Sequence, residues 1–289
     1  MAEWLLDYYA HGLTGTAPAG PINVFRIVIA VAALWKVVYE LRRGSWHWLD
    51  RGTFLRHEFD ERFPRLRGWT RLHRPLIVVK AVAGLMLLTG VASYPAAIAL
   101  ALAMAADECI EPNYHVVYIA SCSIGLALCG GLGEVYSVWD GFSGAARAER
   151  HFAFGVTLIV IVTVSMYWGT AYRKIRTPLF TSGTVLRQFT GAQARSGKSF
   201  PHKETWYPEL YVRYFGGPAR DGASARWKPL SLLTIGMEIL LPFGLLWPVT
   251  WPVAVALGVG MHLAFTFLYP VRLVPFSLAA VGSYLLFAG

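Results

Sequence analysis

Ionisable side chains inside long apolar segments are the residues of this sequence best suited to chemistry. Lys174 follows the apolar run 152–172, while Glu238 and His262 each lie deep in a later run. An ionisable group in hydrocarbon is costly unless it is paired or hydrated, so each of them is a candidate site residue. Lys174 either extends its amine to the membrane surface as an anchor or is uncharged and acts as a base. The second role requires removal of the amine from water and neighbouring cations such as Arg173.

A second polar cluster lies just before and at the start of the apolar run 114–130. It holds Asp107, two glutamates, Asn113 and His115 within residues 107–115. A solvated loop that ends with Asn113 as a helix N-cap explains the carboxylates. It does not explain His115, which shares a helix face with Tyr118. His115 is therefore either a packed core histidine or a site residue.

These residues need helices to position them, and the composition predicts that the helices lie in a membrane. The chain has 289 residues, of which 55% are hydrophobic and only 15% charged, whereas soluble domains average roughly 25% charged residues. Runs of about 17–25 apolar residues predict spanning helices. The sequence predicts an all-α, polytopic integral membrane bundle of about eight spans. The spans are 22–41, 75–91, 95–106, 114–130, 152–172, 229–247, 251–269 and 273–287. The run 95–106 is short enough to be half of a re-entrant pair.

The basic residues predict the orientation of this bundle. Of 26 Lys and Arg residues, nine arginines lie in 42–74 and eleven Lys or Arg in 173–228. With eight spans both loops fall on one side, which the positive-inside rule makes cytoplasmic. We expect a protein of a bacterial cytoplasmic membrane with both termini outside and Lys174 at the cytoplasmic end of its span. The net charge of +9 then needs no nucleic-acid partner.

Several other features of the sequence leave alternatives open. The loop 173–228 mixes aromatic and charged residues and predicts a cytoplasmic cap or lid. Lys36 and Lys80, within the first two runs, are expected to extend their amines to the membrane surface. Arg26 is either an interfacial anchor or a functional residue. Glu238 either forms a buried pair with a histidine or arginine, or contacts a ligand. The three cysteines are expected to be reduced thiols.

Four motifs occur in an order that resembles one known family. Residues 167–175 read Tyr-Trp-Gly-Thr-Ala-Tyr-Arg-Lys-Ile, residues 113–118 read Asn-Tyr-His-Val-Val-Tyr and residues 136–141 read Tyr-Ser-Val-Trp-Asp-Gly, while Glu238 and His262 lie in C-terminal runs. Together they resemble the vitamin K-dependent γ-carboxylase and its bacterial relatives, the horizontally transferred transmembrane (HTTM) proteins. The resemblance extends over nearly the whole chain. We expect no counterpart of the carboxylase's large lumenal domain, which holds its protein substrate.

The resemblance implies roles for residues of this sequence. Lys174 matches the family's catalytic base and His115 its catalytic histidine. In such a mechanism Lys174 deprotonates a hydroquinone, O2 reacts with the phenolate, and His115 hydrogen-bonds the oxygen intermediate on the way to an epoxide. No cofactor beyond O2, and neither metal nor flavin, is expected. The residues expected to bind the substrate are Asn113, Tyr118, Tyr167, Trp168, Tyr172, Glu238 and His262.

These inferences predict an oxidoreductase, a hydroquinone epoxidase or monooxygenase, whose partners are a small aromatic hydroquinone, O2 and the lipid bilayer. Two alternatives stay open. One is a γ-carboxylase-like or maturation enzyme that acts on a peptide. The other is a non-enzymatic quinone- or lipid-binding transporter or complex subunit. The substituents of the hydroquinone and the oligomeric state are not predicted.

Overall fold

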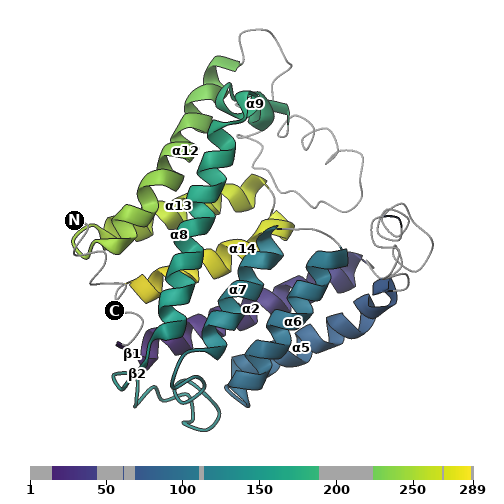
Figure 1. Ribbon diagram of the computed structural model, residues 1–289, viewed down its shortest axis with the longest axis vertical. Coiled ribbons are helices and arrows are strands. Elements are labelled where there is room, and N and C mark those ends of the chain that lie inside the picture. Colours follow the sequence, from purple (N-terminus) through teal and green to yellow (C-terminus); the bar gives the residue numbers. More distant parts are fainter. Residues whose placement is uncertain are drawn as a thin grey trace. The chain divides into compact units, whose positions relative to one another are not determined.

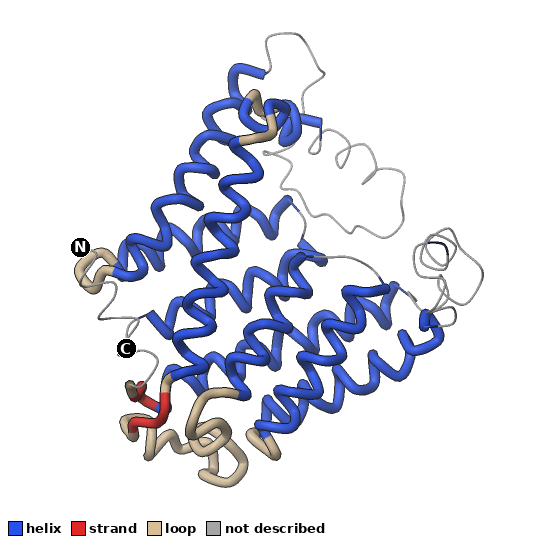
Figure 2. The backbone as a smooth tube through the Cα atoms, viewed as in Figure 1, coloured by secondary structure: helices blue, strands red, loops and turns tan. Residues whose placement is uncertain are grey.

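The computed structural model describes residues 15–43, 61, 69–110, 114–188, 224–268 and 270–287. Most of these residues are helical (Figure 2). The described part contains eight helices of 14 residues or more, and each overlaps one of the eight predicted runs. They are α2 (Ala19–Arg43), α5 (His73–Thr89), α6 (Ser93–Ile110), α7 (Tyr114–Ala127), α8 (Phe154–Ile175), α12 (Ser224–Leu246), α13 (Trp251–Leu268) and α14 (Pro270–Ser283).

Short elements complete the described chain. They are the strands β1 (Thr16–Pro18) and β2 (Arg150–Phe152), the 3-10 helices η2 (Trp69–Leu72) and η3 (Tyr284–Phe287), and helix α9 (Pro178–Thr181). The two strands pair antiparallel, with Ala17 opposite His151. This ribbon, absent from the all-α prediction, ties the start of α2 to the start of α8.

Three helices are long and apolar enough to cross a membrane: Ala19–Arg42, Phe154–Ile175 and Trp227–Leu246. Residues 115–127, 251–266 and 273–287 form shorter apolar helices. Large apolar side chains are also exposed on the helices. In α2, for example, Phe25 and Ile29 are fully buried while Trp35 and Val38 are about half exposed. A helix that is apolar on both faces is typical of a lipid environment, so this is a helical, membrane-associated protein.

Helix α6 corrects the expected boundary of the third run. It spans 18 residues, Ser93–Ile110, instead of the expected 95–106, and so includes Asp107 and Glu108. The expectation that these carboxylates lie in a solvated loop is therefore wrong. Asp107 is buried because it forms ion pairs with lysines of neighbouring helices.

The described chain divides into two compact units. The first contains residues 15–162 and 278–287, and in it α2 packs against α5 and α7 while α6 packs against α5 and α7. These four helices lie side by side (Figure 1). Helix α7 also approaches the start of α8 closely, since a Cβ atom on Gly155 would lie 2.0 Å from the carbonyl oxygen of Gly125.

The loop between α7 and α8 is held by buried polar side chains of α2. The guanidinium of Arg26 donates to the carbonyls of Leu87, Val135 and Tyr136. Asn23 donates to the carbonyl of Gly131 at 3.0 Å. Arg26 is fully buried, so it is not an interfacial anchor; it joins α2 to the end of α5 and to this loop.

The motif at 136–141 folds around one carboxylate. Asp140 accepts hydrogen bonds from the backbone N–H groups of Tyr136, Ser137, Phe142 and Gly144, at 2.8–3.2 Å. Partial removal from water raises the pKa of Asp140, but these four hydrogen bonds outweigh that effect and hold the pKa below its ordinary value. Asp140 therefore organises the turn as an ionised group.

The second unit contains residues 163–277. In its described part α12 packs against α13, and the short helix α9 packs against α12. The C-terminal half of α8 meets α12 through Trp168, whose ring centroid lies 5.3 Å from that of Phe243. It meets α13 through Tyr167, which contacts His262. The expected cap at 173–228 lies largely outside the described residues.

Candidate functional site

Lys174 lies in the last turn of α8, where the second unit surrounds it with partners for a cation. Its amine forms an ion pair with Oε1 of Glu238. The nitrogen also lies 5.2 Å from the ring centroid of Phe180 and 5.5 Å from that of Phe265. The side chain of Lys174 is 23% exposed, so it is partly removed from water and lies next to a carboxylate.

Glu238 completes this pair from the middle of α12. Its side chain is 4% exposed, and Thr170 of α8 also faces it. Oxygen Oε2 is buried and has no hydrogen-bond partner among the described residues. Because buried carboxylate oxygens normally accept hydrogen bonds, Oε2 is positioned to accept one from a bound hydroxyl group or a water molecule.

A second polar group of the same unit centres on His262. Its Nε2 lies 2.6 Å from the hydroxyl oxygen of Tyr167, and its Nδ1 lies 3.2 Å from Oγ of Ser277. His262 is buried between the rings of Phe265 and Phe276. Histidine with a partner on each ring nitrogen can pass a proton from one side to the other.

Phe265 links the two polar groups. Its ring lies 5.5 Å from the Lys174 nitrogen and 5.8 Å from the His262 ring. Tyr167 and Lys174 are seven residues apart in α8 and so share one helix face. The second unit thus brings together four predicted site residues, Lys174, Glu238, Tyr167 and His262.

Two predicted aromatic residues point elsewhere. Trp168 is about two-fifths exposed, and its Nε1 donates to the carbonyl of Ile239 at 3.2 Å. Tyr172 is 58% exposed, and its hydroxyl accepts a hydrogen bond from Arg176 at 2.6 Å. Trp168 thus contacts α12 beside Glu238, whereas Tyr172 contacts Arg176 of its own helix, and none of these contacts reaches the side chain of Lys174 or Glu238.

The remaining predicted site residues belong to the first unit or lie outside the described residues. His115 is half-buried in the first turn of α7. Tyr118 is buried, and its hydroxyl donates to Oγ of Ser283 at 3.1 Å. Asn113 lies outside the described residues. His115 and Lys174 therefore belong to different units, each described by itself.

The first unit contains a buried ionic network that the sequence did not predict. Lys80, fully buried in α5, is ion-paired with Glu40 at 2.6 Å and with Asp107. Lys36 pairs with the same two carboxylates, at 2.5 and 3.6 Å, and His73 lies 3.5 Å from Asp107. The expectation that Lys36 and Lys80 extend to the membrane surface is wrong, because partners from α2 and α6 neutralise them inside the helix group.

Comparison with known proteins adds no assignment to this geometry. No protein-family model matches the chain, and no match was found among curated proteins or solved structures. The resemblance to the γ-carboxylase family therefore rests on the motifs of the sequence.

Proposed function

We propose that this protein is a membrane-embedded oxygenase that deprotonates a small hydroquinone and epoxidises it with O2, without a metal or flavin. The observation that carries the proposal is the Lys174–Glu238 pair, which lies within apolar helices and leaves a buried carboxylate oxygen without a partner among the described residues. A base and an acceptor beside aromatic rings suit a hydroquinone, whose hydroxyl groups are weakly acidic and whose ring is apolar.

The pair provides a route for the first proton. Charges gain less from solvent in a largely dehydrated site than in water, so the proposal requires the neutral form of the pair to be more accessible there than it is in water. Transfer of one proton from Lys174 to Glu238 leaves a neutral amine beside a carboxylic acid. The amine then takes a proton from the hydroquinone, and the resulting ammonium group stabilises the phenolate.

The overall reaction balances without another reductant. The hydroquinone gives four electrons to O2; one oxygen atom enters the ring as the epoxide of a quinone, and the other leaves as water. Phe180 and Phe265 line the amine and would contact the substrate ring. Tyr167 and His262 would carry protons away from the site, and His115 would hydrogen-bond the reduced oxygen.

We extend the proposal to the membrane topology. All eight long helices cross the bilayer, which places the basic loops and the Lys174 end of α8 on the cytoplasmic side. The exposed apolar side chains support this arrangement. They occur also on helices too short for a simple span, including Val82 of α5, Leu102 of α6 and Leu257 of α13.

The direct test uses purified protein in detergent with benzohydroquinone or naphthohydroquinone. We expect O2 consumption and a product one oxygen atom heavier than the quinone. With isotopically labelled O2, the label should appear once in the epoxide. Simple oxidation to the quinone without label in the ring would reject the epoxidase. Turnover that requires an added peptide would favour the peptide-modifying alternative.

A binding function without chemistry has support from one feature of the first unit. An open apolar groove of about 500 Å³ runs between α6 and α7, lined by residues such as Ile98, Leu102 and Ile124. Such a surface fits a lipid or quinone tail. If the protein only binds or transports such a molecule, Lys174→Ala should leave its function largely intact.

A further inference from the structure

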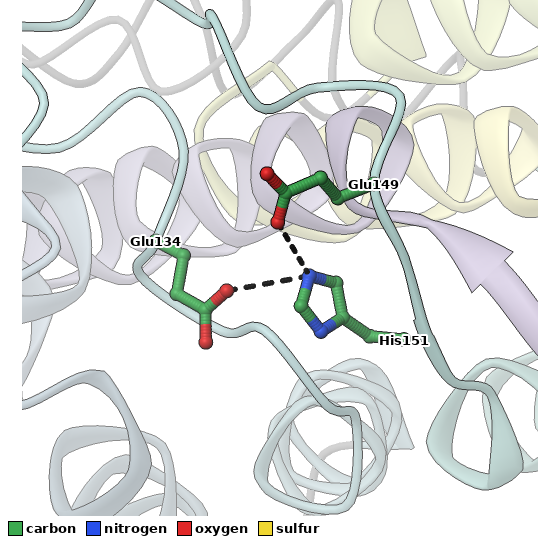
Figure 3. Close-up of side chains that lie close together, drawn as sticks. All are labelled: Glu134, Glu149 and His151. Carbon is green, nitrogen blue, oxygen red and sulfur yellow. Dashed lines mark ion pairs between the residues drawn. The ribbon is translucent and has the colours of Figure 1, made fainter.

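Three side chains with metal-ligating atoms, none of which belongs to the proposed catalytic pair, converge between α7 and α8 (Figure 3). Nε2 of His151 lies 3.3 Å from Oε2 of Glu134 and 4.0 Å from Oε2 of Glu149. The three candidate ligand atoms all lie within 4.8 Å of one another. The carboxylates come from separate turns of the loop and face the imidazole from two directions.

The polar atoms of this cluster lack other partners in the described part of the chain. Nε2 of His151 is buried and forms no hydrogen bond with the described residues, although buried polar atoms normally have a hydrogen-bond partner. Neither carboxylate pairs with a Lys or Arg of the described residues; the nearby Arg150 donates instead to Thr16. With a neutral imidazole the cluster carries two negative charges, which a divalent cation would balance.

The backbone holds the imidazole in place independently of the two carboxylates. His151 lies in β2, paired with Ala17 of β1, and its ring packs on Gly131. A Cβ atom at Gly131 would lie 2.5 Å from that ring, and the φ of +68° there also favours glycine. The sequence places glycine where the ring needs space.

Hydrogen bonds to α2 hold the two turns that carry the carboxylates. The N–H of Gly133 donates to Oδ1 of Asn23 at 2.8 Å, next to Glu134. The carbonyl of Glu149 accepts from the N–H of Ala19 at 2.8 Å. The cluster is therefore preorganised by contacts that do not involve its ligand atoms.

From these observations we propose that Glu134, Glu149 and His151 form a binding site for a divalent transition cation such as Zn²⁺. One imidazole and two carboxylates are ligands that Zn²⁺ accepts, at bond lengths of about 2.0–2.2 Å. A tetrahedral ion with such bonds separates its ligand atoms by about 3.3 Å, which is the His151–Glu134 distance. Glu149, whose side chain is 64% exposed, has room to move closer. Water fills the remaining position.

The test measures metal binding by the full-length protein in detergent, after chelation and dialysis at neutral pH. Titration with ZnCl2 in a calorimeter should give one ion per chain. Glu134→Gln, Glu149→Gln and His151→Ala should each weaken the affinity by at least about tenfold. Glu108→Gln, a change of the same kind on α6 outside the cluster, should leave it unchanged. Co²⁺ bound in place of Zn²⁺ should give visible absorption bands that change when His151 is replaced.

The alternative is that a protonated His151 simply pairs with the two carboxylates. Absence of stoichiometric Zn²⁺ binding, or equal affinity in the wild type and all three variants, would establish that alternative and overturn the metal site. The Glu134 side chain is 55% exposed, so Glu134→Gln should fold. It therefore still tests the site if His151→Ala does not fold. No readout depends on turnover, so the result is independent of the proposed oxygenase activity.

Discussion

Lys174 and Glu238 form an ion pair, and the proposed mechanism predicts a different kinetic effect for the replacement of each. We expect Lys174→Ala to lower hydroquinone turnover by a factor on the order of 10²–10⁴, because the base is lost. Glu238→Gln keeps the shape of the side chain but cannot hold the transferred proton, so it should lower the turnover number more than it raises KM. Steady-state O2 consumption measures both.

Lys228→Ala is the matched control for that experiment, since it removes an exposed lysine of α12. Its rate should equal that of the wild type. If Lys174→Ala and Glu238→Gln lower thermal stability but leave the rate intact, the pair is structural and the assignment of Lys174 as the base is wrong.

Asp140 should make the stability of the protein depend on pH at the acid end. Its pKa is held below the ordinary value by four backbone hydrogen bonds, so the folded state binds its proton less readily than the unfolded state does. The stabilisation is complete above the unfolded pKa of about 3.9 and is lost as pH falls through the lower folded pKa. Thermal unfolding of Asp140→Asn between neutral pH and about pH 3 should show a lower midpoint at neutral pH and a smaller loss on acidification. Equal profiles for both proteins would contradict this role.

Depth in an apolar run singled out Glu238 and His262, both of which have polar partners in the structure, whereas Lys174 follows its run and drew its proposed role from the resemblance. The same criterion misjudged Lys80, because whether an amine extends to water or stays inside depends on carboxylates contributed by other helices. The cluster at Glu134, Glu149 and His151 gave no recognisable spacing in the sequence. It arises from the β1–β2 ribbon and from hydrogen bonds of Asn23 and Ala19 in α2, which are contacts distant along the chain.

At the scale of helices, the ionic network joins α2, α5 and α6. Lys80→Met leaves Glu40 and Asp107 with Lys36 alone, an uncompensated buried charge. We expect it to destabilise the protein by about 3–5 kcal/mol. The double variant Lys80→Met/Asp107→Asn restores charge balance and should recover part of that loss. Chemical denaturation in detergent measures both differences.

Lys228→Met controls for loss of a lysine as such, and it should change the free energy of unfolding little. A Lys80→Met protein as stable as the wild type, or a double variant less stable than Lys80→Met, would mean that the network does not hold the three helices together.

The apolar runs predicted that the eight long helices exist, but they predicted the ends of those helices less accurately. Helix α6 continues four residues beyond its predicted end because Asp107 finds cations in α2 and α5, so a polar residue need not end a buried helix. Helix α12 begins at Ser224 and continues through Pro229, where the sequence predicted a start. Pro229 lies inside α12, where it removes one intrahelical hydrogen bond, so proline did not mark the start of this helix.

For the molecule as a whole, the proposal assigns a role in the same reaction to His115 and to Lys174, and a double variant tests whether they act together. His115 belongs to the first unit and Lys174 to the second. If both serve the same deprotonation and oxygenation, His115→Ala combined with Lys174→Ala should lose little more activity than Lys174→Ala alone. Initial rates of the two single variants and the double variant measure this coupling. Losses that multiply would mean that the two residues act independently.

The fold class and the membrane setting follow from composition and periodicity, which are properties of each segment by itself. The division into two units does not, since it depends on which helices pack together. Neither does the ribbon of β1 and β2, whose strands have three residues each. Strands that short carry no alternating pattern for a sequence to reveal.

In the proposed topology, in which α5 crosses the bilayer, its buried lysine also constrains how the chain is made. During synthesis α5 leaves the ribosome before α6, so Lys80 reaches the insertion machinery after Glu40 but before Asp107. Because a lone charge is strongly disfavoured in lipid, we expect α5 to stay beside α2 within the insertion machinery until α6 arrives. The three helices would then leave for the bilayer together, as one partly assembled group.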